Sequence, residues 1–249
     1  MLAPATGRFL SVLKNFLVRT NTIADQGIRD GLAETLIKLG EILETHSGNE
    51  NQIAMDTRLS DVGKDERIVE LAKATLKRVL FVAQKAVDAQ TAKARLEAVL
   101  FAVPDAPKGV NEIIQHLREA EIRTHLRSLE VGERFGEYLK ALHAEDSTEA
   151  TEVIRAVRLA PGVALIPEAT RQKAERERVK AMKPVESTKL QSLEEAAEVL
   201  EALAEALLSW LRSYRAELPI GRPTITSGQY LMGYSDAITF PMLKDPVRT

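Results

Sequence analysis

Residues 192–228 read SLEEAAEVLEALAEALLSWLRSYRAELPIGRPTITSG, and the chain changes character within them. Before Pro219, leucines recur mostly at three- or four-residue steps, as they do along one face of an α-helix. From there to the end of the chain no helical period remains, and the helix-breaking residues are Pro219, Gly221, Pro223, Gly228, Gly233, Pro241 and Pro246. The sequence therefore predicts an all-α, multi-helix body over residues 1–218 and an extended, non-helical C-terminal arm over residues 219–249.

The arm is not the polar tail that is typical of a disordered terminus. Ordering its backbone costs on the order of 30–60 kcal/mol at ~1–2 per residue, whereas burying its apolar side chains returns roughly 15–30 kcal/mol. The arm therefore needs a surface, on its own body or on another chain. We expect its partner-binding residues to be Ile225, Tyr230, Leu231, Met232, Tyr234, Ile238, Phe240, Met242 and Leu243, with the aromatic residues among them as anchors.

The composition is that of a core-forming protein, with 45% hydrophobic and 28% charged residues among 249. Only 4% of the residues are aromatic, which favours helices packed through aliphatic seams over sheets. A net charge of −2 gives no bulk attraction to nucleic acid or to an anionic membrane. The absence of cysteine excludes disulfides and thiolate chemistry.

The N-terminal 24 residues contain three basic residues and no acidic one. Their apolar residues follow helical spacing and are interrupted by charges, so we expect no signal peptide and a location in the cytoplasm or within an assembled particle. Residues 1–19 could instead lie on a membrane surface, but packing against the next helix is the favoured interpretation. The longest apolar run, residues 98–103, is far too short to span a bilayer.

Apolar spacing in the first half of the chain predicts helices over residues 6–20 and 23–45, which should form a hairpin. Polar residues 46–64 predict the first long loop. Residues 65–102 contain neither proline nor glycine and predict one helix, a strut about 57 Å long at ~1.5 Å per residue. The alternative is two helices with a break near Asp88.

In the second half, Asn111 should cap a helix that carries Ile113, Ile114, Leu117 and Leu126. Shorter helices follow over residues 131–143 and 148–159. Asp146 and Glu149 are the expected capping pair of the latter. Residues 163–166 read as a connector, and residues 168–189 predict an exposed helix that ends before Pro184. Ser192 and Glu195 predict a capping box for the last helix, and a sub-boundary within the body is expected near residues 160–190.

No motif for catalysis, metal binding or nucleotide binding is present. Glu112, His116 and Glu119 share a helix face, but their spacing is not that of a di-iron motif, and we expect a surface ion pair or hydrogen bond there. The pair Gly63-Lys64 lacks the preceding glycine and the following serine or threonine of a phosphate-binding loop. We therefore expect a protein without catalytic residues, metal or cofactor.

One local excess of positive charge lies within residues 168–189. Its candidate nucleic-acid contacts are Arg171, Lys173, Arg176, Arg178, Lys180 and Lys183. The segment has no aromatic residues for base stacking, and its glutamates dilute the charge, so it could offer only phosphate contacts without sequence reading.

These patterns favour a non-enzymatic structural or adaptor protein, a subunit of a larger and homo-oligomeric assembly. Its arm would dock on a neighbouring copy or on another assembly protein, as swapped extensions do in rings and shells, including virus particles and head-to-tail connectors. The alternative is a nucleic-acid-associated helical protein that uses residues 168–189.

Overall fold

The computed structural model describes residues 4–107, 109, 111–144, 147–212, 220–226 and 229–234. Most of these residues are helical, which confirms the predicted all-α, multi-helix class. The chain divides into two compact units: unit 1 comprises Met1–Arg95 and Lys189–Thr249, and unit 2 comprises Leu96–Thr188. Unit 2 is therefore an insertion in the chain of unit 1. The predicted limit between the body and the arm lies at residues 218 and 219, outside the described residues.

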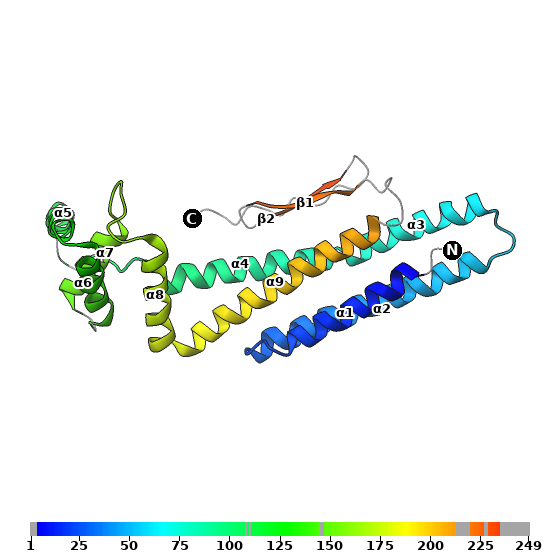
Figure 1. Ribbon diagram of the computed structural model, residues 1–249, viewed down its shortest axis with the longest axis horizontal. Coiled ribbons are helices and arrows are strands. Elements are labelled where there is room, and N and C mark those ends of the chain that lie inside the picture. The colour runs from blue at the N-terminus through cyan, green and yellow to red at the C-terminus, as the bar shows by residue number, and fades with distance from the viewer. Residues whose placement is uncertain are drawn as a thin grey trace. The chain divides into compact units, whose positions relative to one another are not determined.

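Unit 1 is built around a hairpin of α1 (Pro4–Thr20) and α2 (Gln26–Met55), which lie side by side in Figure 1 as predicted. Asp25 caps α2, and its side chain accepts a hydrogen bond from the Ile28 amide at 3.0 Å. Apolar faces of α1, α2, α3 (Asp61–Val79), α4 (Phe81–Leu100) and α9 (Pro184–Arg212) form one core. Its most deeply buried members include Leu36, Leu39, Leu43, Ala72, Val82 and Leu203.

The predicted loop over residues 46–64 is wrong, because α2 continues to Met55 and α3 begins at Asp61. Two of its polar residues, His46 and Glu50, lie one turn apart on the buried face of α2. The His46 Nδ1 atom lies 2.7 Å from the Thr75 hydroxyl of α3, and the His46 ring meets the Trp210 ring edge-on at 5.1 Å between centroids. The helix continues through these polar residues because they have partners in the interior.

Residues 65–102 form parts of two helices, α3 and α4, but the break falls at Leu80 and not near Asp88. Leu80 keeps helical dihedral angles, with φ −60° and ψ −23°, and its carbonyl accepts from the Gln84 amide at 3.2 Å. Asp88 lies within α4, where its side chain accepts a hydrogen bond from Gln84. The shortage of large apolar residues around Asp88 therefore reflects a polar helix surface and not a break.

The last helix, α9, begins at Pro184, so the predicted capping box at Ser192 and Glu195 is wrong. Proline is well suited to the first turn because the amide it lacks would have no partner there. Ser192 is buried, and its hydroxyl accepts a hydrogen bond from the Asp25 amide at 3.0 Å. The serine thus joins α9 to the start of α2 instead of starting its own helix.

Unit 2 contains α5 (Glu112–Ser128), α6 (Val131–His143), α7 (Thr148–Arg158) and α8 (Glu168–Met182), which Figure 1 shows in green to yellow-green. Asn111 caps α5 as predicted, but Ser147 caps α7 in place of the expected pair. Asp146, the first member of that pair, lies outside the described residues. The predicted connector over residues 163–166 is neither helix nor strand. Unit 2 has a core of its own, formed by Leu126, Tyr138, Ala141, Leu142, Ala150, Ile154, Val157, Leu165 and Ile166.

Within the arm, the structure describes two strands, β1 (Ile220–Thr226) and β2 (Gln229–Tyr234), which pair antiparallel. Ile225 is the backbone partner of Tyr230, and Pro223 that of Met232. The last residues of the arm, 235–249, lie outside the described residues. None of the helices in the described part of the chain is long and apolar enough to cross a membrane.

Candidate functional site: the buried charges of unit 2

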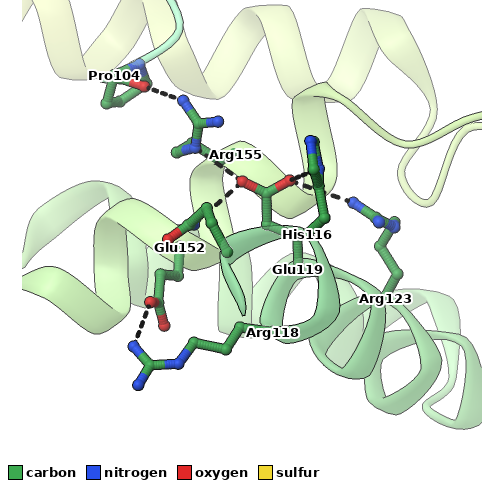
Figure 2. Close-up of polar contacts among 8 residues, drawn as sticks. Pro104, His116, Arg118, Glu119, Arg123, Glu152 and Arg155 are labelled. Carbon is green, nitrogen blue, oxygen red and sulfur yellow. Dashed lines mark hydrogen bonds and ion pairs between the residues drawn. The ribbon is translucent and has the colours of Figure 1, made fainter. Parts of the chain in front are cut away.

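Glu119 of α5 is a carboxylate with almost no contact with solvent, since only 1% of its surface is exposed. Figure 2 shows it at the centre of a group of cationic side chains from α5 and α7. Its Oε1 atom accepts hydrogen bonds from Arg155 Nε at 2.8 Å and from Gln115 Nε2 at 3.1 Å. Its Oε2 atom lies 3.7 Å from Arg123 Nη1. Both carboxylate oxygens therefore have cationic partners.

Burial and pairing act in opposite directions on this carboxylate. Burial alone raises the pKa of Glu119, but hydrogen bonds from Gln115 and Arg155 and the charges of Arg155 and Arg123 outweigh it and hold the pKa below its usual value. A general acid would need a raised pKa to carry a proton near neutral pH. Glu119 instead stays ionised, as a fixed negative charge in the interior.

Arg155 joins three parts of unit 2. It lies in α7, binds Glu119 of α5 through Nε, and donates through Nη1 to the carbonyl of Pro104 at 2.8 Å (Figure 2). Arg158, one turn later, donates to the carbonyl of Ala102 at 3.0 Å. Two arginines of one helix thereby fasten the irregular segment that precedes α5.

The expected pair of His116 and Glu119 is present at 3.9 Å, but only His116 is at the surface, with 75% of its side chain exposed. A metal ion would need further ligands on the same face. Across the described ranges of the chain, no group of three or more histidine, aspartate or glutamate residues could hold a metal ion.

A second buried carboxylate, Glu175 of α8, contacts α6 and α7. Its Oε1 atom accepts hydrogen bonds from the Tyr138 hydroxyl at 2.5 Å and from Arg171 Nη1 at 2.8 Å, and it lies 3.7 Å from Arg158 Nε. Burial, followed by the hydrogen bond to Glu175 and its negative charge, raises the pKa of Tyr138 well above its usual value. The phenol therefore keeps its proton and acts as a hydrogen-bond donor.

A half-open cavity of about 30 Å³ adjoins this cluster. Its walls combine Tyr138, Arg158, Glu175 and Arg178 with apolar side chains of Leu100, Phe101, Leu142, Ile154 and Val179. One water molecule needs roughly 10–15 Å³ of such space. The cavity therefore has room for a water molecule or a small ion.

The candidate nucleic-acid contacts Arg171, Lys173, Arg176, Arg178 and Lys180 lie in α8, and Lys183 is its C-cap. They fall into two classes. Arg171 pairs with Glu175 and Glu168, Arg176 lies 3.5 Å from Glu97, and Arg178 lines the cavity. The three lysines are exposed. Arg171 is thus engaged within unit 2, whereas the three lysines and Arg176, with 53% of its side chain exposed, form the exposed basic surface of α8.

The structure describes five of the nine predicted partner-binding residues of the arm. Ile225 lies in β1, and Tyr230, Leu231, Met232 and Tyr234 lie in β2. Ile238, Phe240, Met242 and Leu243 lie outside the described residues. The structure therefore places the first five in one pair of strands, and docking of the arm stays a prediction.

Sequence reasoning missed Tyr138, Arg155 and Glu175 as buried polar groups. A signal existed for Arg155, because it lies between Ile154 and Ala156, both buried, and is the one charged residue among residues 153–157. A charge in such surroundings indicates an interior partner. The identity of that partner depends on how helices pack, which the spacing of one helix does not reveal.

Comparison with protein-family models, with curated proteins and with solved structures finds no match to this chain. The case for a function therefore rests on the chain's own geometry and chemistry.

Proposed function

We propose that this chain is a non-enzymatic structural or adaptor protein that joins copies of itself into a larger assembly through its C-terminal arm. One observation carries the proposal: the described part of the arm forms a two-stranded sheet, β1 with β2. An isolated pair of strands is at best marginally stable in water, and each outer edge presents unpaired backbone groups. Such a sheet is stabilised when another surface covers it or another strand joins it.

The sequence of the arm supports the same proposal. Beyond β2 it continues with Ile238, Phe240, Met242 and Leu243, and apolar side chains of this kind favour a binding surface over solvent. A docked arm joins subunits without enlarging the helical body. Addition of strands from one chain to another is one established mode of such docking.

The buried charges of unit 2 agree better with a scaffold than with a catalyst. Arg155 and Arg158 of α7 approach Glu119 of α5 and Glu175 of α8, respectively. The cavity beside Glu175 has room for a water molecule or a small ion. The arrangement of the buried charges fixes helices relative to one another within unit 2. We therefore place this protein among the subunits of ring or shell assemblies, such as those of virus particles and head-to-tail connectors, either in the cytoplasm or within the particle.

The test compares the solution mass of the full chain with that of a chain ending at Leu218, by light scattering after size exclusion. We expect a multimer for the full chain and a monomer for the truncated chain, with equal helix content by circular dichroism. Phe240→Asp should weaken assembly because it removes an apolar anchor. Lys244→Ala is the control, since it removes a charge from the same arm and no large apolar group. Full assembly of the truncated chain would contradict the proposal.

A second candidate function is nucleic-acid association through α8, and the exposure of Lys173, Lys180 and Lys183 favours it. Contacts of this kind would bind phosphates without reading bases, so the affinity should fall steeply with salt. We expect the triple change of these lysines to glutamine to abolish any gel shift. The same change of Lys14, Lys38 and Lys77 in unit 1 controls for net charge, and an equal loss there would argue against α8 as the surface.

A further inference from the structure

The half-open cavity of unit 2 lies among three arginines and one carboxylate. Arg158 and Arg178 line it together with Glu175, and Arg171 reaches the same carboxylate from one turn earlier on α8. Arg171 also approaches Glu168, a residue whose side chain is 70% exposed and therefore solvated. The charged side chains around the cavity thus include more positive than negative groups.

The hydrogen bonds of the cluster converge on a single atom. The Tyr138 hydroxyl and Arg171 Nη1 both donate to Glu175 Oε1, and Arg158 Nε lies 3.7 Å from the same oxygen. Arg178 is not among these donors. Its Nε atom is buried and has no hydrogen-bond partner within the described residues.

A buried guanidinium N–H without an acceptor is costly, and native structures seldom leave one. Arg178 is one of the residues that line the cavity, so a small occupant there can accept its hydrogen bond. A water molecule would supply an acceptor but would leave the excess positive charge uncompensated. A small anion supplies both an acceptor and the missing charge.

We propose that this cavity binds a small monovalent anion, a halide or a carboxylate as small as formate, with Arg178 Nε as a donor. The volume of about 30 Å³ accommodates one such ion. Phosphate and sulfate are larger and would extend out of the half-open cavity. A double charge would also be disfavoured by the apolar walls, which include Leu100, Leu142 and Ile154.

This site is independent of the proposed assembly function, because no residue of the arm takes part in it. The anion would act as a fixed component of unit 2, since it completes the charge balance between α6, α7 and α8. Its removal should loosen α8, whose contacts with the rest of unit 2 are largely polar.

The test measures broadening of the ³⁵Cl NMR line of chloride by the full-length protein. Two variants of α8 are compared, Arg178→Gln and Lys173→Gln. They remove the same charge from the same helix, but Lys173 is exposed and does not line the cavity. We expect wild type and Lys173→Gln to broaden the line equally, and Arg178→Gln to lose affinity at least about tenfold, as the loss of one charge-assisted hydrogen bond implies.

Formate added to the chloride sample distinguishes the two kinds of monoanion. If formate displaces chloride when its concentration is below that of chloride, the site prefers a carboxylate. If displacement requires more formate than chloride, the site prefers a halide.

Equal broadening by wild type and Arg178→Gln overturns the proposal and assigns the cavity to water. If Arg178→Gln does not fold, the wild-type chain is crystallised in bromide and anomalous diffraction is used to locate the ion. An anomalous peak within hydrogen-bond distance of Arg178 Nε supports the proposal, and water density alone at that place overturns it.

Discussion

Arg155 shows how a single side chain organises unit 2, because it binds Glu119 of α5 and the Pro104 carbonyl while belonging to α7. The pair is buried, with 15% of the Arg155 side chain and 2% of the Glu119 side chain exposed. A buried ion pair adds little net stability compared with apolar residues of the same shape, yet removal of one partner leaves the other charge buried without compensation. The pair of Glu119 and Arg155 therefore determines how α5 packs against α7, and it contributes less to the net stability of unit 2.

We predict that Arg155→Met destabilises unit 2 by about 3–5 kcal/mol, the usual cost of breaking a buried pair from one side. The measurement is hydrogen exchange of α5 and α7 by mass spectrometry. Lys140→Met is the control, since Lys140 and its partner Glu137, 2.7 Å away, are both exposed, and exposed pairs contribute little to stability. Equal effects of the two substitutions would mean that burial of Glu119 does not matter.

His46 predicts a pH dependence in unit 1. Burial lowers its pKa from 6.5 to about 4. The unfolded chain therefore takes up a proton near pH 6.5, whereas the folded chain takes it up only near pH 4. The contribution of neutral His46 to the free energy of unfolding is therefore present above pH 6.5, and it is lost as the pH drops from 6.5 toward 4. Linkage gives a loss of about 2 kcal/mol between pH 7 and pH 5.

The measurement is urea unfolding followed by the fluorescence of Trp210, whose ring contacts His46. His46→Gln should be less stable at pH 7 because it disturbs the contact with Thr75. Its free energy of unfolding should, however, change by about 2 kcal/mol less than that of wild type over the same pH interval. Parallel pH profiles for wild type and variant would show that His46 is not the titrating group.

At this scale the sequence predicts local contacts better than distant ones. Asn111 was predicted as a helix cap because the bond it makes, to the Ile113 amide, involves a neighbour in the chain. Glu119 was expected at the surface because its decisive partner, Arg155, lies on another helix. No spacing rule within α5 could identify that partner.

Glycines within helices offer a test at the scale of the element. The second helix, α2, contains Gly31 and Gly48, both exposed, and a methyl group added at either would meet no atom within 4 Å. No neighbouring helix therefore comes close to the backbone of α2 at these two positions. We predict that Gly31→Ala and Gly48→Ala each stabilise unit 1 by about 0.5–1 kcal/mol.

Thermal unfolding of each variant measures this effect. Gly162 provides the matched control, because a methyl group there also meets no atom within 4 Å but the backbone has a positive φ of 77°. Alanine is strained in that conformation, so Gly162→Ala should destabilise by about 1 kcal/mol. Glycine-to-alanine substitution is thus expected to raise the free energy of unfolding at the two positions in α2 and to lower it at Gly162. Destabilisation by all three substitutions would contradict the assignment of open space along α2.

Element boundaries were predicted well where a chemical signal marks them and poorly where packing sets them. The range predicted for α6, residues 131–143, matches the helix Val131–His143. For α9, Ser192 and Glu195 have the spacing of a capping box, but Pro184 can start the helix earlier, and Ser192 is used by Asp25. Residues 46–55 are predicted as a loop because polar residues usually lie at the surface. His46 and Glu50, however, face the core.

At the scale of the whole molecule, the two apolar cores share no residue. The spacing of apolar residues is helical on both sides of unit 2, so it does not indicate that these two parts of the chain build unit 1 together. Only long-range contacts reveal it, such as the hydrogen bond between Asp25 and Ser192. Separate cores are the usual mark of parts that could fold alone.

We therefore predict that a fragment of residues 96–188 folds by itself. Its amide NMR signals from α5, α6 and α7 should overlay those of the full chain, and it should unfold cooperatively on heating. The same fragment carrying Arg155→Met serves as the control, since loss of the buried pair should lower its melting temperature as in the full chain. A wild-type fragment with the spectrum of an unfolded chain would show that unit 2 depends on unit 1.

The insertion of unit 2 also fixes an order of events during synthesis. Helices α1 to α4 leave the ribosome before α9, which supplies Leu200, Leu203 and Leu207 to their common core. At ~5–20 residues per second, translation from Arg95 to the end of α9 takes about 5–25 seconds. During that interval the apolar faces of the first helices lack their last partner, whereas unit 2 has all of its residues once Thr188 is made, before α9 is complete. The first half of unit 1 is thus exposed to chaperones and to aggregation for as long as the ribosome needs to complete the insertion.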